Sequence, residues 1–139
     1  MRWTRIYAAF LGTGLLLVGC NQGGLDATVT GKVTVDDRDA PSGEVTFYPV
    51  DWDTTPPTPR GLIGRDGVYT LKVGAKTGLP SGEYKVAVQV MDTLEPPKGN
   101  QPPAARPLSP VRYGDPTTSG FEFTVKPGAN TFDLTIKGK

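Results

Sequence analysis

Tyr84-Lys85-Val86-Ala87-Val88-Gln89-Val90-Met91 is the stretch with the clearest pattern in the sequence. Its large side chains Tyr84, Val86, Val88 and Val90 alternate with Lys85, Ala87, Gln89 and Met91. A period of two places alternate side chains on opposite faces of the backbone. The stretch therefore predicts a β-strand that buries one face.

The same period recurs on both sides of this stretch. The predicted strands cover residues 28–35, 44–48, 61–64, 68–73, 84–91, 121–126 and 132–137, with a brief strand at 111–114. Turn-forming residues separate them, with loops at 36–43 and 74–82 and a turn at 127–130. Asp66-Gly67 between two strands predicts a hairpin, and the proline-rich segments 51–60 and 93–110 predict loops.

This spacing of short strands predicts an all-β fold. About seven strands with one apolar face each are typical of an Ig-like antiparallel β-sandwich. A small closed barrel is the alternative. The immunoglobulin Cys…Trp…Cys signature is absent, and no amphipathic helix follows residue 26.

Composition excludes several kinds of chemistry. The 139 residues include one cysteine and no histidine, which excludes an intramolecular disulfide, a His- or multi-Cys zinc site and catalysis by a histidine base. Arg2 and Arg5 precede Cys20 and no acidic residue does, so 13 of the 15 basic side chains and all 14 acidic ones follow it. This balance lacks the basic excess of a protein that binds nucleic acid.

The first twenty residues have the features of a secretory signal. Two arginines stand in residues 1–5, and an apolar run of about a dozen residues follows at 6–18. A membrane-spanning helix needs roughly 20 apolar residues, so the run predicts a cleaved signal peptide. The arginines are not adjacent, which argues against the twin-arginine route.

Leu17-Val18-Gly19-Cys20 resembles the lipobox of bacterial lipoproteins. The resemblance implies cleavage before Cys20, lipidation of its sulfur and anchoring to a membrane of the cell envelope, since two or more acyl chains anchor a protein stably. The resemblance also brings a sorting rule, by which Asn21, the residue after the cysteine, favours the outer membrane over the inner one. The alternative is an ordinary signal peptide that ends near a buried or free cysteine. If the lipobox is used, residues 1–19 are the lipoprotein signal peptide and residues 20–26 are the lipidated tether, in which Gly23-Gly24 is flexible.

Residues 27–139 resemble the carboxypeptidase regulatory-like, or transthyretin-like, β-sandwich domains. The similar segments are Val29–Val35 with Gly43–Tyr48, Asp66–Leu71 and Leu79–Val88, and residues 113–130 look like the C-terminal half of such domains. Asp37-Arg38-Asp39 departs from the family's tight turn. The resemblance implies a transthyretin-like sandwich, of a kind that occurs in small bacterial lipoproteins of unassigned activity.

Two groups of acidic residues are candidates for calcium binding. Asp51 and Asp53 flank Trp52, and Asp36, Asp37 and Asp39 surround Arg38. Calcium takes six to eight oxygen ligands, and neither group has the glycine and distal glutamate of an EF-hand loop. We therefore expect a solvated loop and a turn, with no metal or cofactor bound.

The aromatic and nucleophilic side chains also have structural interpretations. Trp52, Tyr48 and Tyr113 would form a sugar-binding platform if exposed together, whereas aromatic residues more often pack in cores. Tyr84 is expected to fix a corner through its hydroxyl. Ser81 and Ser119 stand beside glycines but in no nucleophile-elbow motif. No recognisable acid pair is formed by Glu44, Glu83, Glu95 and Glu122.

These observations predict a non-enzymatic module. We expect a lipid-anchored β-sandwich at the periplasm or cell exterior, which serves binding, scaffolding or cell-surface structure. Its expected partners are the membrane, through lipid on Cys20, and an unidentified protein or glycan, with no nucleic acid. A carbohydrate-binding module that uses exposed aromatic residues is the alternative. The proline-rich loop 93–110 is either a plain surface loop or a ligand for a partner's groove.

Overall fold

Strand β8 (Gly82–Thr93) is the longest of the described elements and contains the stretch with the clearest alternation. It belongs to a computed structural model that describes residues 24–51, 58–93, 99–100 and 104–138. Tyr84, Val86, Val88 and Val90 of β8 are each at most 4% exposed, which confirms the face that the sequence predicted to be buried.

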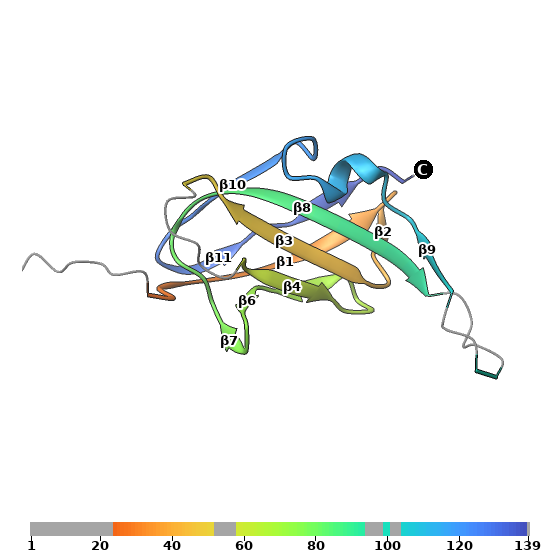
Figure 1. Ribbon diagram of the computed structural model, residues 1–139, viewed down its shortest axis with the longest axis horizontal. Coiled ribbons are helices and arrows are strands. Elements are labelled where there is room, and N and C mark those ends of the chain that lie inside the picture. Colours follow the sequence, from red (N-terminus) through yellow and green to blue (C-terminus); the bar gives the residue numbers. More distant parts are fainter. Residues whose placement is uncertain (1–23, 52–57, 94–98, 101–103, 139) are drawn as a thin grey trace, which may run out of the picture.

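The described chain is all-β apart from one short 3₁₀ helix (Figure 1). Its remaining elements, in order, are β1 (Ala27–Val35), β2 (Arg38–Asp39), β3 (Gly43–Pro49), β4 (Arg60–Ile63), β5 (Val68–Thr70), β6 (Lys72–Val73), β7 (Lys76–Thr77), β9 (Ala105–Pro107), η1 (Val111–Gly114), β10 (Phe121–Val125), β11 (Gly128–Thr131) and β12 (Leu134–Ile136).

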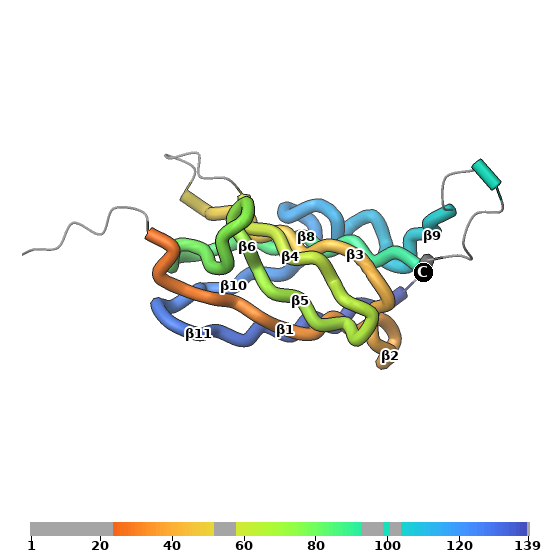
Figure 2. The backbone as a smooth tube through the Cα atoms, turned by 90° about the horizontal axis from the view of Figure 1, so that it is seen from below, coloured from red at the N-terminus to blue at the C-terminus, as the bar shows by residue number. Residues whose placement is uncertain are grey.

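The strands form two sheets. One sheet has the order β10-β8-β3-β4-β6-β7 with antiparallel pairing throughout, and β9 pairs with the end of β8. The other sheet is built around β1, which pairs with β2, β5, β11 and β12. Figure 2 shows the two layers from the side, with β3, β4 and β8 in one and β1 and β11 in the other. This arrangement is a β-sandwich, as predicted, and not the closed barrel.

The core lies between the two layers. Phe47 of β3 is fully buried, and its ring centroid lies 5.7 Å from Tyr84, 6.3 Å from Phe123 and 6.1 Å from Phe132. Phe123 and Phe132 stack with centroids 4.4 Å apart, which joins β10 of one sheet to the C-terminal strand of the other. Burial of a side chain such as Phe47 contributes about 1.5–3 kcal/mol.

One tyrosine crosses β1 at a glycine. Gly31 pairs with Tyr69 of β5, and the Tyr69 hydroxyl donates a 2.5 Å hydrogen bond to the carbonyl of Phe132 on the far side of β1. Phe132 lies between β11 and β12, where the C-terminal strand is interrupted. A Cβ at Gly31 would overlap the Phe132 carbonyl and touch the Tyr69 ring. The missing side chain therefore makes room for this contact.

Several local predictions from the sequence are wrong or incomplete, among them the single strand predicted at 68–73, which is divided into β5 and β6 in different sheets. Residues 111–114 form the helix η1, because Pro110 holds an extended backbone and its carbonyl accepts a bond from Tyr113 N. The turn predicted at 127–130 is largely strand β11, which pairs with β1 in parallel. β12 is also parallel to β1, although antiparallel pairing was predicted throughout. The loop predicted at 74–82 contains β7, which pairs with β6 in a hairpin.

A turn forms at Asp66-Gly67, but the hairpin predicted there does not, because the flanking strands β4 and β5 belong to different sheets. Gly67 has φ +77°, its N–H bonds to the Gly64 carbonyl, and Asp66 Oδ1 accepts the N–H of Val68. The strands that it joins separate, since β4 pairs with β3 and β5 pairs with β1. The turn therefore carries the chain from one sheet to the other.

We predict that Gly31→Ala destabilises the fold by about 3 kcal/mol, because the new methyl group displaces either the Phe132 carbonyl or the Tyr69 ring. Urea unfolding measures this change. Thr30→Ala, at the exposed neighbouring position, is the matched control and changes the free energy of unfolding by less than about 1 kcal/mol. Equal effects of the two variants would contradict the packing described for Gly31.

Candidate functional site

Several residues that the sequence singled out lie outside the described part of the chain. They are Cys20, Trp52, Asp53 and Glu95, together with most of the first half of the proline-rich loop 93–110. The second half of that loop contains β9, whose Arg106 pairs with Asp92 of β8 at 3.1 Å.

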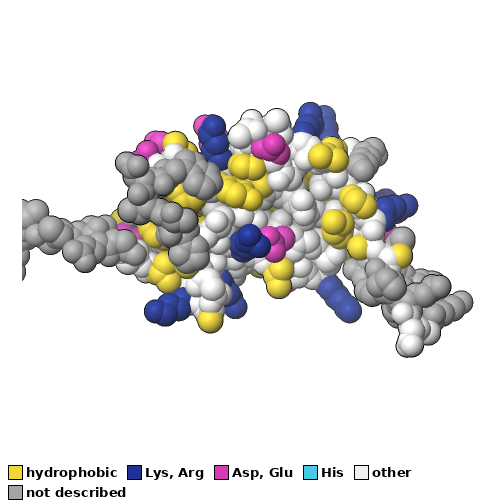
Figure 3. Space-filling model, in the orientation of Figure 1, with side chains coloured by type: hydrophobic (Ala, Val, Ile, Leu, Met, Phe, Trp, Pro, Cys, Tyr) yellow, Lys and Arg dark blue, Asp and Glu magenta, His cyan; other side chains and the backbone are white. Residues whose placement is uncertain are grey.

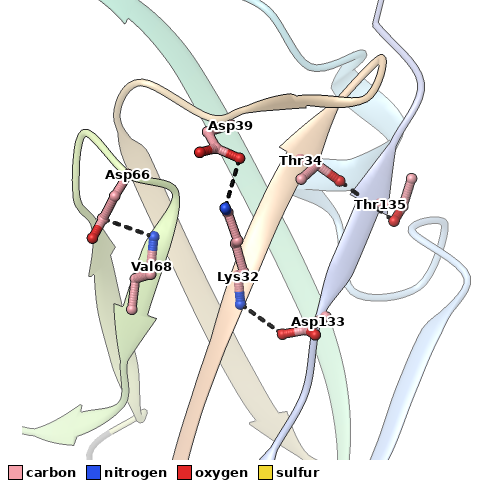
Figure 4. A network of polar contacts seen from close by, with 7 residues as sticks. All are labelled: Lys32, Thr34, Asp39, Asp66, Val68, Asp133 and Thr135. Atoms are coloured by element: carbon pink, nitrogen blue, oxygen red, sulfur yellow. Dashed lines mark hydrogen bonds and ion pairs between the residues drawn. The ribbon is translucent and has the colours of Figure 1, made fainter.

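The acidic residues near β1 surround a lysine. Lys32 Nζ lies 2.9 Å from Asp39 Oδ1, and the Lys32 N–H donates to Asp133 Oδ1 (Figure 4). The bond and charge of Asp39, with the charges of Asp66 and Asp133, raise the pKa of Lys32. The Lys32 ammonium group therefore supplies, next to these carboxylates, the positive charge that a bound calcium ion would otherwise supply.

Asp36 and Asp37 form the turn that the sequence predicted. Both residues have positive φ, of 48° and 63°, as in the two-residue turn of a β-hairpin, and β1 and β2 pair on either side. Asp36 Oδ1 accepts the N–H of Gly138 at 3.1 Å. Within the described ranges, no group of three His, Cys, Asp or Glu residues is arranged to hold a metal ion.

Tyr113, one of the three aromatic residues considered for a sugar-binding platform, is buried. Tyr113 is 7% exposed, its ring stacks on Phe121 at 5.6 Å, and Arg112 lies over its face at 4.7 Å. Tyr113 therefore packs at the edge of the core, which is the structural interpretation that the sequence analysis favoured over a sugar-binding platform. Tyr48 lies on the outer face of β3 and is half-buried.

Tyr84 fixes a corner, as predicted. Its hydroxyl donates a 2.7 Å hydrogen bond to the carbonyl of Pro80, four residues upstream, at the turn into β8. Burial, with a smaller contribution from the charge of Asp26, raises the pKa of Tyr84 to about 12. The same corner holds Ser81, whose N–H and hydroxyl both donate to the Asp26 carboxylate, at 2.7 and 2.8 Å.

Two buried serines attach the segment that carries η1 to β8. The Ser109 hydroxyl accepts the N–H of Val90 at 3.0 Å, and the Ser119 hydroxyl donates to the Val86 carbonyl at 2.5 Å. Ser119 also accepts the N–H of Phe121. Both hydroxyls are thus engaged by the backbone, which gives each serine a structural role.

The outer face of β4, β3 and β8 is hollowed. A recess of about 90 Å³ has Thr46 and Ala87 at its floor, which are 8% and 5% exposed. Glu44 and Arg60 line one side of the recess, and Gln89 lines the other. The sequence analysis did not single out Arg60 or Gln89, although the alternation of β8 alone assigns Gln89 to this face.

The ion pair on this face is loose. Arg60 Nη1 and Glu44 Oε1 are 3.7 Å apart, beyond hydrogen-bond distance, and their side chains are 62% and 38% exposed. The Thr46 hydroxyl donates to the same Glu44 oxygen at 3.2 Å. An exposed pair of this kind contributes at most about 1 kcal/mol to stability. Its two groups are therefore available to other hydrogen-bonding partners.

Comparisons with known proteins show little sequence similarity. No family model matches the sequence, and no curated protein matches it. Similar solved structures include a DUF3823 family protein from Parabacteroides merdae, with 14% identity and a TM-score of 0.40 over 81% of this chain. The match covers 46% of that protein, so the chain spans less than half of its length.

A second similar structure is the dioxygenase domain of a dioxygenase and carbohydrate-binding protein fusion from the cellulolytic bacterium Streptomyces sp. SirexAA-E. It has 17% identity and a TM-score of 0.40, and the match covers 88% of this chain and 86% of that domain. Similarity at this level carries no argument about function.

We predict that Tyr84→Phe makes stability less dependent on alkaline pH. The folded state raises the pKa from 10.0 to about 12, so in that interval the unfolded chain loses a proton that the folded chain keeps. Stability present below pH 10 is therefore lost towards pH 12, at about 1.4 kcal/mol per pH unit. Denaturant unfolding across this interval should give a flatter slope for Tyr84→Phe. Identical slopes would contradict the buried phenol.

Proposed function

We propose that the chain is a lipid-anchored β-sandwich of the bacterial cell envelope that acts as a non-enzymatic binding or scaffolding module. The observation that carries the proposal is Leu17-Val18-Gly19-Cys20 at the end of a short apolar run. Lipid on Cys20 would hold the module at a membrane, and Asn21 favours the outer membrane. The residues quoted for the carboxypeptidase regulatory-like resemblance support a module of that kind.

The distance from Cys20 to the sandwich supports an anchoring role. Six residues separate Cys20 from the first residue of β1, Ala27, so the seven Cα–Cα steps between these two residues span at most about 25 Å when fully extended. β1 starts at one end of the long axis, whereas β9 and η1 lie towards the other end (Figure 1). A lipid on Cys20 would therefore hold the module by one end and leave both outer faces accessible.

The engagement of the polar side chains supports a non-enzymatic role. The hydroxyls of Ser81 and Ser119 are hydrogen-bonded within the fold. Every buried polar side-chain atom in the described residues has a hydrogen-bond partner.

Among the described residues, no helix is long and apolar enough to cross a membrane.

Carbohydrate binding is a second candidate function. A sugar-binding platform of exposed aromatic residues cannot include Tyr113, because Tyr113 is buried. What favours the candidate is the recess beside Tyr48 on the outer face of β3 and β8, with its carboxylate, guanidinium and amide groups. Groups of these types recognise sugar hydroxyls by hydrogen bonds.

The anchoring proposal predicts that the mature N-terminus is an acylated Cys20. Mass spectrometry of the membrane-extracted protein should identify the lipid. Cys20→Ala removes the sulfur that would carry lipid, and stable anchoring needs two or more acyl chains, so this variant should move from the membrane to the soluble fraction. Asn21→Ser is the matched control and should stay in the membrane fraction. A mature N-terminus at any other residue would overturn the proposal.

A further inference from the structure

The outer face of the β3–β8 sheet carries a continuous groove. Three neighbouring hollows, of about 510, 90 and 240 Å³, form it, and the first lies at the β4 edge, where Val68–Thr70 of β5 from the other sheet also line it. The first and second share Glu44 and Arg60, and the second and third share Gln89 and Gly114. Adjacent strands are about 4.8 Å apart, so the part of the groove from β4 across β3 to β8 is roughly 10 Å long, and the groove continues to η1.

The groove is part of the folded scaffold. Its floor is formed by central strands, and the wall beside η1 is attached to β8 by the buried serines Ser109 and Ser119. A Cβ added at Gly114 would lie 3.1 Å from Gln89 Nε2, so the glycine leaves room for the amide. A site on such a scaffold requires little ordering when a ligand binds.

The chemistry of the groove changes along its length. Near its middle, Glu44 and Arg60 neutralise each other without a close hydrogen bond, and Gln89 supplies an amide that both donates and accepts. Figure 3 shows a basic and an acidic side chain side by side near the middle of this face, with hydrophobic side chains on both sides. The hollow beside η1 is lined by Met91, Pro110 and Val111, and Val111 is 85% exposed.

We infer that this groove binds an extended, uncharged oligosaccharide. A chain of sugars presents hydroxyls that both donate and accept, and it also presents apolar C–H faces, which match the polar middle and the apolar end of the groove. The charged residues that line the groove balance, with Glu44 and Asp115 against Arg60 and Lys72, so it offers no net charge to an ionic ligand. The inference goes beyond membrane anchoring and names a site and a ligand class for the second candidate function.

An extended peptide fits this face less well. β3 is paired on both sides by β4 and β8, and β8 is paired on both sides by β3 and β10, so their backbone groups are already used. A peptide that adds to a sheet needs an exposed strand edge. The ligand must therefore be recognised through side chains, which suits a saccharide.

The test is calorimetric titration of the purified mature protein, whether or not it carries lipid on Cys20. The probes are cellohexaose, xylohexaose, mannohexaose, an oligogalacturonate and a decaproline peptide. We expect at least one neutral hexasaccharide to bind. Gln89→Ala and Arg60→Ala should each weaken that binding about tenfold, the loss typical of a hydrogen bond to a charged or well-placed group.

Arg38→Ala, an exposed arginine of β2 in the opposite sheet, is the matched control and should change the affinity by less than about twofold. Unchanged melting temperatures show that the exposed substitutions leave the fold intact. The inference is overturned if no neutral hexasaccharide binds, if only the oligogalacturonate or decaproline binds, or if both groove variants bind like the unmodified protein. None of these outcomes depends on lipidation, which the mature N-terminus reports separately.

Discussion

The hydrogen bond from Tyr69 to the carbonyl of Phe132, made across Gly31, ties together one whole layer of the sandwich. β1 is the strand around which that layer is built, and Tyr69 connects the segment on one side of β1 to the segment on the other. The tyrosine is 1% exposed, and burial together with the charge of Asp133 raises the pKa of its hydroxyl. Without this donor, the interruption between β11 and β12 would leave a partly buried carbonyl without its hydrogen bond, which costs at most about 3 kcal/mol.

The two outer faces of the sandwich use their polar side chains differently. On the β1 layer, Lys32 and the nearby carboxylates make close contacts with one another and with the backbone. On the β3–β8 layer, Glu44 and Arg60 are close but not hydrogen-bonded to each other, and the surface between them and η1 is recessed. This contrast makes the second face the better candidate for recognition of a ligand.

Side-chain alternation predicted most of the fold, because burial on one face leaves a period of two in the sequence. It predicted β1, β3, β8 and β10, and the tendency of a buried tyrosine hydroxyl to find a partner predicted the corner at Tyr84. It could not predict the parallel pairing of β1 with β11, since parallel and antiparallel strands alternate alike. Gly128-Ala129-Asn130 has poor strand propensity and forms β11 only because β1 provides a pairing partner. The groove could not be predicted from the sequence either, because its residues come from strands that are far apart in the sequence and share no local motif.

The parallel pairing of β1 with β11 and β12 also determines how the sandwich would respond to mechanical force. The described chain begins at one end of the long axis and finishes at the other, and these strands lie between those two points (Figure 1). Tension applied between residues 24 and 138 would pull β1 and its parallel partners past each other along their length. Their hydrogen bonds would then carry the load together in shear, whereas strands peeled from one end break their bonds one after another.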